Sequence, residues 1–125
     1  MENAYVHVYS RKQALSDGVL IDLSELAREA GFRWPLAVTS RLYYEYLVPS
    51  LELASDGQSL TGRAWDLLNV LKYAIGQAKD ESFLRFSVYF LMSRGSSPIP
   101  IELVSIAGPG DEGEPVLTVL LPDED

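Results

Sequence analysis

The sequence predicts a single α+β domain, in which a mixed sheet with a C-terminal antiparallel meander packs against several helices. Apolar residues recur at helical spacing over residues 62–79. Residues 83–92 alternate between polar and apolar side chains, as a half-buried strand does, and two more apolar runs follow at 99–106 and 116–121. A chain of 125 residues, 47% of them hydrophobic, can bury one core but is too short for two.

The first half of the chain predicts short strands that alternate with short helices. Ser10, Asp22 and either Thr39 or Ser40 stand where helix N-caps are expected, the first two in capping-box spacing, and Gly31 stands where a C-terminal cap is expected. The expected elements are a strand at 4–9, a helix at 11–16, a strand at 19–21, a helix at 24–30, a strand at 36–38 and a helix at 41–48.

Residues 62–79 predict the central helix, with Thr61 as its N-cap. The inward arc of this helix consists of Ala64, Leu67, Leu68, Leu71, Ala74, Ile75 and Ala78. The preceding residues, 50–60, are rich in serine and contain Asp56-Gly57, so they predict a loop.

The last third predicts the meander. Pro100 has no N–H, so its strand should lie at an edge of the sheet or begin outside the ladder. Residues 107–115 are rich in glycine and proline and predict a long hairpin loop. The expected order is therefore β-α-β-α-β-α-α-β-β-β, with helices on one face of the sheet, and an acidic tail at 122–125.

The negative charge is concentrated at the C-terminal end. The net charge is −8; residues 1–94 hold 11 acidic and 10 basic side chains, whereas residues 95–125 hold 7 acidic and no basic ones. Such a surface repels phosphates, so we expect no direct nucleic-acid binding and a basic protein surface as the partner. The predicted partner-binding residues are Asp111, Glu112, Glu114, Asp123, Glu124 and Asp125. The alternatives are a solvated hairpin turn with a frayed tail, and imitation of the phosphates of a nucleic acid.

The composition speaks against catalysis, metal binding and a cofactor. The chain has no cysteine, and its one histidine, His7, lies in the predicted first strand with no second ligand at local spacing. The stretch GPGDEGEP offers three carboxylates to a phosphate, which would repel it, and it lacks the spacing of a calcium loop. No run has the length of a membrane span and the first residues do not resemble a secretory leader, so we expect a cytoplasmic protein without enzymatic activity.

Aromatic and arginine side chains suggest an alternative function. A pocket for a small anionic molecule, such as a nucleotide, would combine stacking with charge. Its candidate residues are Arg33, Trp34, Arg41, Tyr43 and Tyr44. Ordinary surface arginines and core packing explain these residues as well, and the exposed aromatics are also compatible with a homodimer.

Three stretches carry a resemblance to a known family: YSRKQALSDGVLIDLSELAREAGFRWPLAVT, GRAWDLL and GPGDEGEPVLTVLLPDED. Together they resemble a family of small uncharacterised proteins carried on bacterial plasmids and phages, classed only as a domain of unknown function. The resemblance implies no established activity. It does imply a context, because small proteins of mobile elements often act against host defences as anti-CRISPR or antirestriction inhibitors.

Overall fold

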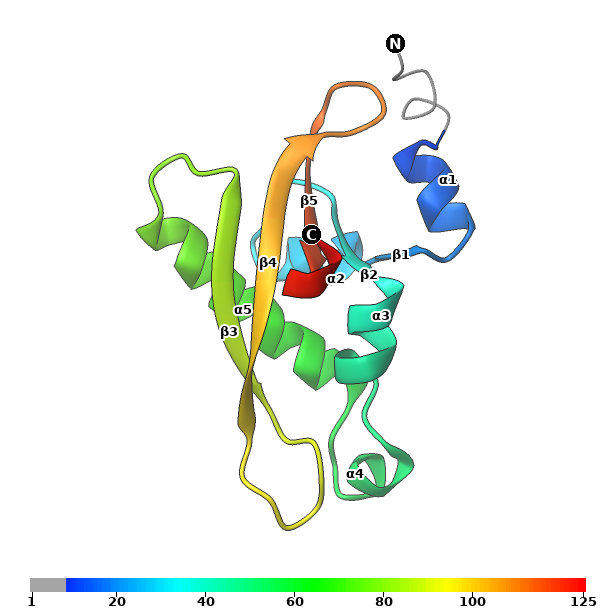
Figure 1. Cartoon of the computed structure of the whole chain (residues 1–125), viewed down its shortest axis with the longest axis vertical. Helices are drawn as coiled ribbons and strands as arrows, with labels where there is room; N and C mark the ends of the chain where they lie inside the picture. Colours follow the sequence, from blue (N-terminus) through cyan, green and yellow to red (C-terminus); the bar gives the residue numbers. More distant parts are fainter. Residues whose placement is uncertain (1–8) are drawn as a thin grey trace.

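The computed structural model describes residues 9–125 as a five-stranded sheet with helices on both faces (Figure 1). The strands are β1 (Leu20–Asp22), β2 (Leu36–Thr39), β3 (Phe83–Phe90), β4 (Ile99–Pro109) and β5 (Pro115–Leu120). Their order is β1-β2-β5-β4-β3; β2 and β5 are parallel, and the other neighbours are antiparallel. The α+β class and the meander β3-β4-β5 are confirmed, whereas the predicted strand at 4–9 falls outside the described residues.

The helical elements are α1 (Arg11–Ser16), α2 (Ser24–Glu29), α3 (Ser40–Leu42), the π-helical turn η2 (Tyr43–Leu47), α4 (Leu51–Ser55), α5 (Leu60–Gln77) and the 3-10 turn η3 (Pro122–Glu124). Two predicted caps are confirmed. The Ser10 hydroxyl accepts from the Gln13 amide at 3.0 Å, and the Thr39 hydroxyl accepts from the Leu42 amide at 3.3 Å. Each hydroxyl satisfies an amide that has no partner within its helix.

Three local expectations are wrong, and all three concern caps. Residues 50–60 are not one loop, because the Ser50 hydroxyl caps α4 and Leu53 is buried. The central helix begins at Leu60, since Ser59 rather than Thr61 accepts from the Gly62 amide. The expected Asp22 capping box is replaced by a tighter turn, in which the Asp22 carboxylate accepts from the Ser24 amide at 2.9 Å.

The main core lies between the sheet and α5. Leu67, Leu68 and Leu71 of α5 are completely buried against the same sheet face as Leu103 of β4 and Val88 of β3. In Figure 1, α5 runs behind β3 and β4 along this face. The predicted inward arc is confirmed at these leucines and ends before Ile75, which is 39% exposed.

The expectation that helices cover only one face is wrong, because α1 and η3 lie on the opposite face from α5. Arg11 of α1 donates to the Thr118 hydroxyl at 2.7 Å, and the Thr118 side chain points away from the core side of β5. Glu124 of η3 meets Thr39 on the same face of β2. Val104, on this face of β4, is therefore also fully buried.

Pro100 lies in an inner strand, so the first of its two predicted places, at an edge of the sheet, is wrong; the second agrees in part, because the first residues of β4 lie outside the ladder with β5. β4 lies between β5 and β3, but its pairing with β5 extends only from Val104 to Pro109. The Ala107 amide donates to the Ser82 carbonyl, and hydrogen-bonded pairs then alternate along the register, which makes Pro100 and Tyr89 a non-hydrogen-bonded pair. The missing N–H thus faces a side where β5 is no longer present.

Within residues 9–125, none of the helices is both long enough and apolar enough to cross a membrane.

Candidate functional site

The six predicted partner-binding residues form two groups at opposite ends of β5. Residues 111–114 lie in the β4–β5 loop, and residues 123–125 lie in or just after η3. The six residues of β5 separate the groups by about 20 Å along the strand. The structure therefore divides the one acidic surface that we expected into two separate acidic groups.

In the first group, Asp111 holds the loop against α1. Its carboxylate accepts from the amides of Arg11 and Lys12, at 2.8 and 2.9 Å, which are the first amides of α1. These two hydrogen bonds, of which the one from Lys12 has the larger effect, lower the pKa of Asp111 below its ordinary value. Asp111 therefore acts as a cap supplied from 100 residues away in the chain.

The rest of the loop is ordered by its own hydrogen bonds. The Glu114 carboxylate accepts from the Glu112 amide at 2.9 Å, and the Gly110 amide donates to the Glu114 carbonyl at 2.6 Å. Gly113 has φ +83°, a conformation that glycine adopts without strain. Among the described residues, nothing bonds the Glu112 carboxylate, so this loop presents that side chain to solvent.

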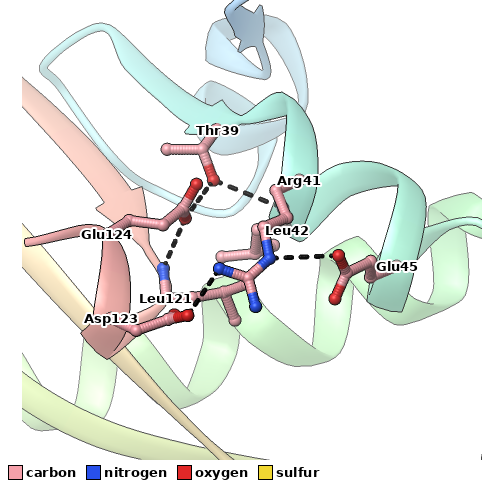
Figure 2. Close-up of polar contacts among 7 residues, drawn as sticks. All are labelled: Thr39, Arg41, Leu42, Glu45, Leu121, Asp123 and Glu124. Atoms are coloured by element: carbon pink, nitrogen blue, oxygen red, sulfur yellow. Dashed lines mark hydrogen bonds and ion pairs between the residues drawn. The ribbon is translucent and has the colours of Figure 1, made fainter.

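The second group anchors the C-terminal turn to α3, as Figure 2 shows. Arg41 donates from Nη1 to Asp123 at 2.7 Å and from Nε to Glu45 at 3.0 Å. The hydrogen bond from Arg41 lowers the pKa of Asp123. Glu124 accepts from the Thr39 hydroxyl at 2.7 Å and from the Leu121 amide at 2.9 Å. The tail is therefore an ordered turn up to Glu124, not a frayed end.

Most cationic side chains bond groups of the chain itself. Within residues 9–125, six of the ten lysines and arginines do so. Arg11, Arg63 and Lys72 donate to neutral oxygens, whereas Arg41, Arg85 and Arg94 form ion pairs with carboxylates. Arg94 illustrates the pattern, because it pairs with Asp56 at 2.7 Å and with Glu52 at 3.3 Å. The net charge of −8 is thus carried by carboxylates that outnumber the available cations.

The alternative ligand-binding residues do not form one pocket. Arg33 and Trp34 precede β2, whereas Arg41, Tyr43 and Tyr44 follow it, so the two sets lie at opposite ends of that strand. The rings of Tyr43 and Tyr44 meet edge to face, with centroids 4.9 Å apart. Tyr43 packs against the core, while Tyr44 is 65% exposed.

A cavity does lie beside Trp34, but the residues that line it differ from the predicted set. Its volume is about 410 Å³. It is lined by Gly31, Phe32, Arg33, Trp34, Lys72, Ile75 and Leu117. Lys72 donates to the Ala30 carbonyl at 3.0 Å and so reaches over the end of α2. Sequence reasoning missed Lys72, because nothing in the spacing of α5 indicates which loop it faces.

The buried Arg63 was also missed. It is 4% exposed, and its guanidinium donates to the Tyr46 carbonyl at 2.7 Å, to the Leu91 carbonyl, and to the Gln58 side chain at 3.3 Å. Its charge lies over the ring of Phe90, 5.7 Å from the centroid. Burial lowers the pKa of Arg63. Its place four residues before Leu67, on the inward arc, was the available signal.

Residues 9–125 contain no group of three or more His, Cys, Asp or Glu side chains that could hold a metal ion. His7 falls outside this part of the chain. No curated protein and no solved structure is significantly similar to the chain. One family model, described as "Family of unknown function (DUF6573)", matches residues 2–125. Since the match extends over nearly the whole sequence and includes both acidic groups, the chain belongs to this family of unknown function.

Proposed function

We propose that the protein is a non-enzymatic binding protein of a plasmid or phage, which inhibits a host defence system by protein–protein contact in the bacterial cytoplasm. An anti-CRISPR or antirestriction protein is the kind of inhibitor that the resemblance of its motifs suggests. The observation that carries the proposal is the distribution of charge. Three arginines form ion pairs within residues 9–125, whereas the six carboxylates at the two ends of β5 belong to a stretch, residues 95–125, that contains no lysine or arginine.

The two acidic groups divide into anchoring and presenting residues. Asp111, Asp123 and Glu124 hold the loop and the C-terminal turn in place. Glu112 and Asp125 are exposed, and within residues 9–125 neither carboxylate bonds another group of the chain. Fixed backbones with outward carboxylates suit the lysine and arginine side chains of a basic partner, with little loss of conformational freedom on binding.

The experiment is affinity purification of the tagged protein from a bacterial lysate at low and at high salt, followed by mass spectrometry. We expect a stoichiometric partner with a basic surface that is released as salt rises, because exposed charge pairs are screened. The combined variant Glu112→Lys and Asp125→Lys should lose this partner and keep the thermal midpoint of the wild type.

The control is the double variant Glu29→Lys and Asp66→Lys, which makes the same charge change at exposed positions of α2 and α5 that lie outside both acidic groups. It should retain the partner. If the partner remains bound to the combined variant, or is lost equally from both variants, the acidic groups are not the docking site.

The cavity beside Trp34 favours a second candidate, the binding of a small aromatic anion such as a nucleotide. Phe32 and Trp34 supply rings, while Arg33 and Lys72 supply positive charge at the same cavity. A thermal-shift screen with nucleotides and cyclic dinucleotides tests this candidate, since a ligand that binds only the folded state raises the midpoint. Trp34→Ala should abolish the shift; the absence of any shift at millimolar ligand would refute this candidate.

A further inference from the structure

β3 is an edge strand of the sheet, and in Figure 1 α5 passes behind it and ends beyond its outer side. It forms eight consecutive pairs with β4, from Phe83 to Phe90, without a bulge. Its other side faces no strand among residues 9–125. The opposite edge of the sheet, β1, is only three residues long, and shortness is one of the ways in which edges are protected from pairing. β3 contains no proline and one charged residue, Arg85, so it lacks such protection.

The register identifies which backbone groups point outward. The Ala107 amide donates to the Ser82 carbonyl, so even-numbered residues of β3 bond to β4. The position of Pro100 opposite Tyr89 agrees, because a proline fits only at a non-hydrogen-bonded pair. The N–H and C=O groups that face outward therefore belong to Phe83, Arg85, Ser87 and Tyr89.

The side chains of these four residues also lie on the open face of the sheet. Phe86, Val88 and Phe90 point into the core, so the odd-numbered residues point the other way. Phe83 is 38% exposed and Tyr89 is 65% exposed. α1 and η3 cover this face over β2 and β5, and in Figure 1 both lie away from β3. Two aromatic rings thus flank an unpaired edge.

We propose that β3 pairs antiparallel with β3 of a second copy of this chain, which joins two five-stranded sheets into one of ten strands. Pairing around Phe86 places Phe83 of each copy opposite Tyr89 of the other, and Arg85 opposite Ser87. Aromatic pairs are among the favourable cross-strand pairs, and no like charges stand directly opposite one another. This register also satisfies the four outward amides of each strand.

The charges near the edge are compatible with this two-fold arrangement. Arg85 is paired with Glu102 on the neighbouring strand, at 3.3 Å. Asp80 and Glu81 precede the strand, and antiparallel pairing places them beside the end of the other β3 rather than beside each other. The whole chain carries −8, however, so two copies repel at long range. We therefore expect the dimer to tighten as salt rises, whereas the proposed docking on a basic partner weakens.

The size of the contact sets its strength. We estimate that two eight-residue strands and their flanking rings bury about 1,000 Å², which is typical of weak, transient interfaces rather than of stable ones. We therefore expect a reversible dimer with a Kd in the micromolar range. The measurement is sedimentation velocity from about 1 to 500 µM protein, in low salt and in about 0.5 M NaCl.

Two variants test the edge. Ser87→Pro removes an outward amide and leaves the hydrogen bonds between β3 and β4 intact. Tyr89→Lys introduces a charge on the edge strand, and charges of this kind protect the edges of natural sheets from pairing. Each should raise the dimer Kd at least tenfold without changing the helical circular dichroism signal. The control is Tyr73→Lys, since Tyr73 is 70% exposed but lies on α5. It should dimerise like the wild type.

Hydrogen exchange locates the contact. The amides of Phe83, Arg85, Ser87 and Tyr89 should exchange rapidly at 1 µM protein and slowly at 500 µM. Three results would overturn the proposal: a monomer at every concentration, a dimer that Tyr89→Lys leaves unchanged, or amides that are already protected in the monomer. The last result would mean that the edge is covered within a single chain.

Discussion

Replacement of the buried Arg63 by methionine should destabilise the fold. The guanidinium bonds two backbone carbonyls, one in η2 and one just after β3, and so joins the end of η2 to the end of a strand. Methionine fills most of the same volume but donates no hydrogen bond. The carbonyls of Tyr46 and Leu91 would then lose their charged donor in a site where Arg63 itself is 4% exposed.

The expected size of the effect follows from two opposing terms. A buried acceptor left without a donor costs about 1–3 kcal/mol, and two acceptors are affected. The variant also avoids the free-energy penalty of burying a cation, and this offsets part of the loss of stability. The two backbone carbonyls stay in place when the side chain is replaced, so the cost of leaving them without a donor should dominate. We expect the free energy of unfolding to fall by about 2–4 kcal/mol. For a chain of this size, that corresponds to a decrease in Tm of about 8–16 °C.

The assay is urea unfolding followed by circular dichroism, with Arg85→Met as the control. Arg85 makes its ion pair with Glu102 at the surface, where both side chains are more than half exposed, so its replacement should change stability by less than about 1 kcal/mol. If Arg63→Met is as stable as wild type, or more so, while Arg85→Met behaves as expected, the two carbonyls do not depend on the guanidinium and the reasoning fails.

Three further predictions concern acid sensitivity, the core and two glycines. The pKa values of Asp111 and Asp123 are lowered in the folded state, so their contribution to stability is complete above the ordinary pKa of 3.8 and is lost as pH falls below it. Urea unfolding at pH 2–7 should therefore show a weaker acid dependence for the double variant Asp111→Asn, Asp123→Asn than for wild type; an unchanged slope would contradict the assignment. Leu103→Ala should cost about 2–5 kcal/mol of unfolding free energy in the same assay, because Leu103 is completely buried between the sheet and α5. Gly31→Ala should lower the stability by about 1–3 kcal/mol, since φ is +101° and the new Cβ would lie 2.8 Å from a lysine nitrogen; Gly76→Ala, in open space on α5, should raise it by about 0.5–1 kcal/mol.

The sequence predicted the elements whose signal is local. The inward leucines of α5 and the alternation of β3 were sufficient, because one buried face dictates the period of apolar residues. The serines at 50–60 led to the wrong prediction of a loop, because serine is common both in turns and at helix N-caps. Ser50 and Ser59 each begin a helix, and the buried Leu53 was the apolar residue that distinguished a helix from a loop.

The sequence could not predict how distant charges are used. The acidic residues of the last quarter looked like one surface, but Asp111 caps α1 and Asp123 pairs with Arg41. Likewise, Arg33 and Arg41 looked like parts of one pocket, although β2 separates them. These relations depend on strand order, and the insertion of β5 between β2 and β4 is not visible in local periodicity.

The central position of β5 also determines when the chain can fold. β2 ends at Thr39, and its parallel partner β5 begins at Pro115, so the middle of the sheet exists only after β5 has been synthesised. Until then β2 and β4 each lack a neighbour, and α1 lacks the Asp111 carboxylate that caps it. Contacts that are so distant in sequence slow folding, because loop closure must precede the gain from packing. We therefore expect β1 and β2 to join the rest of the sheet only after β5 has formed.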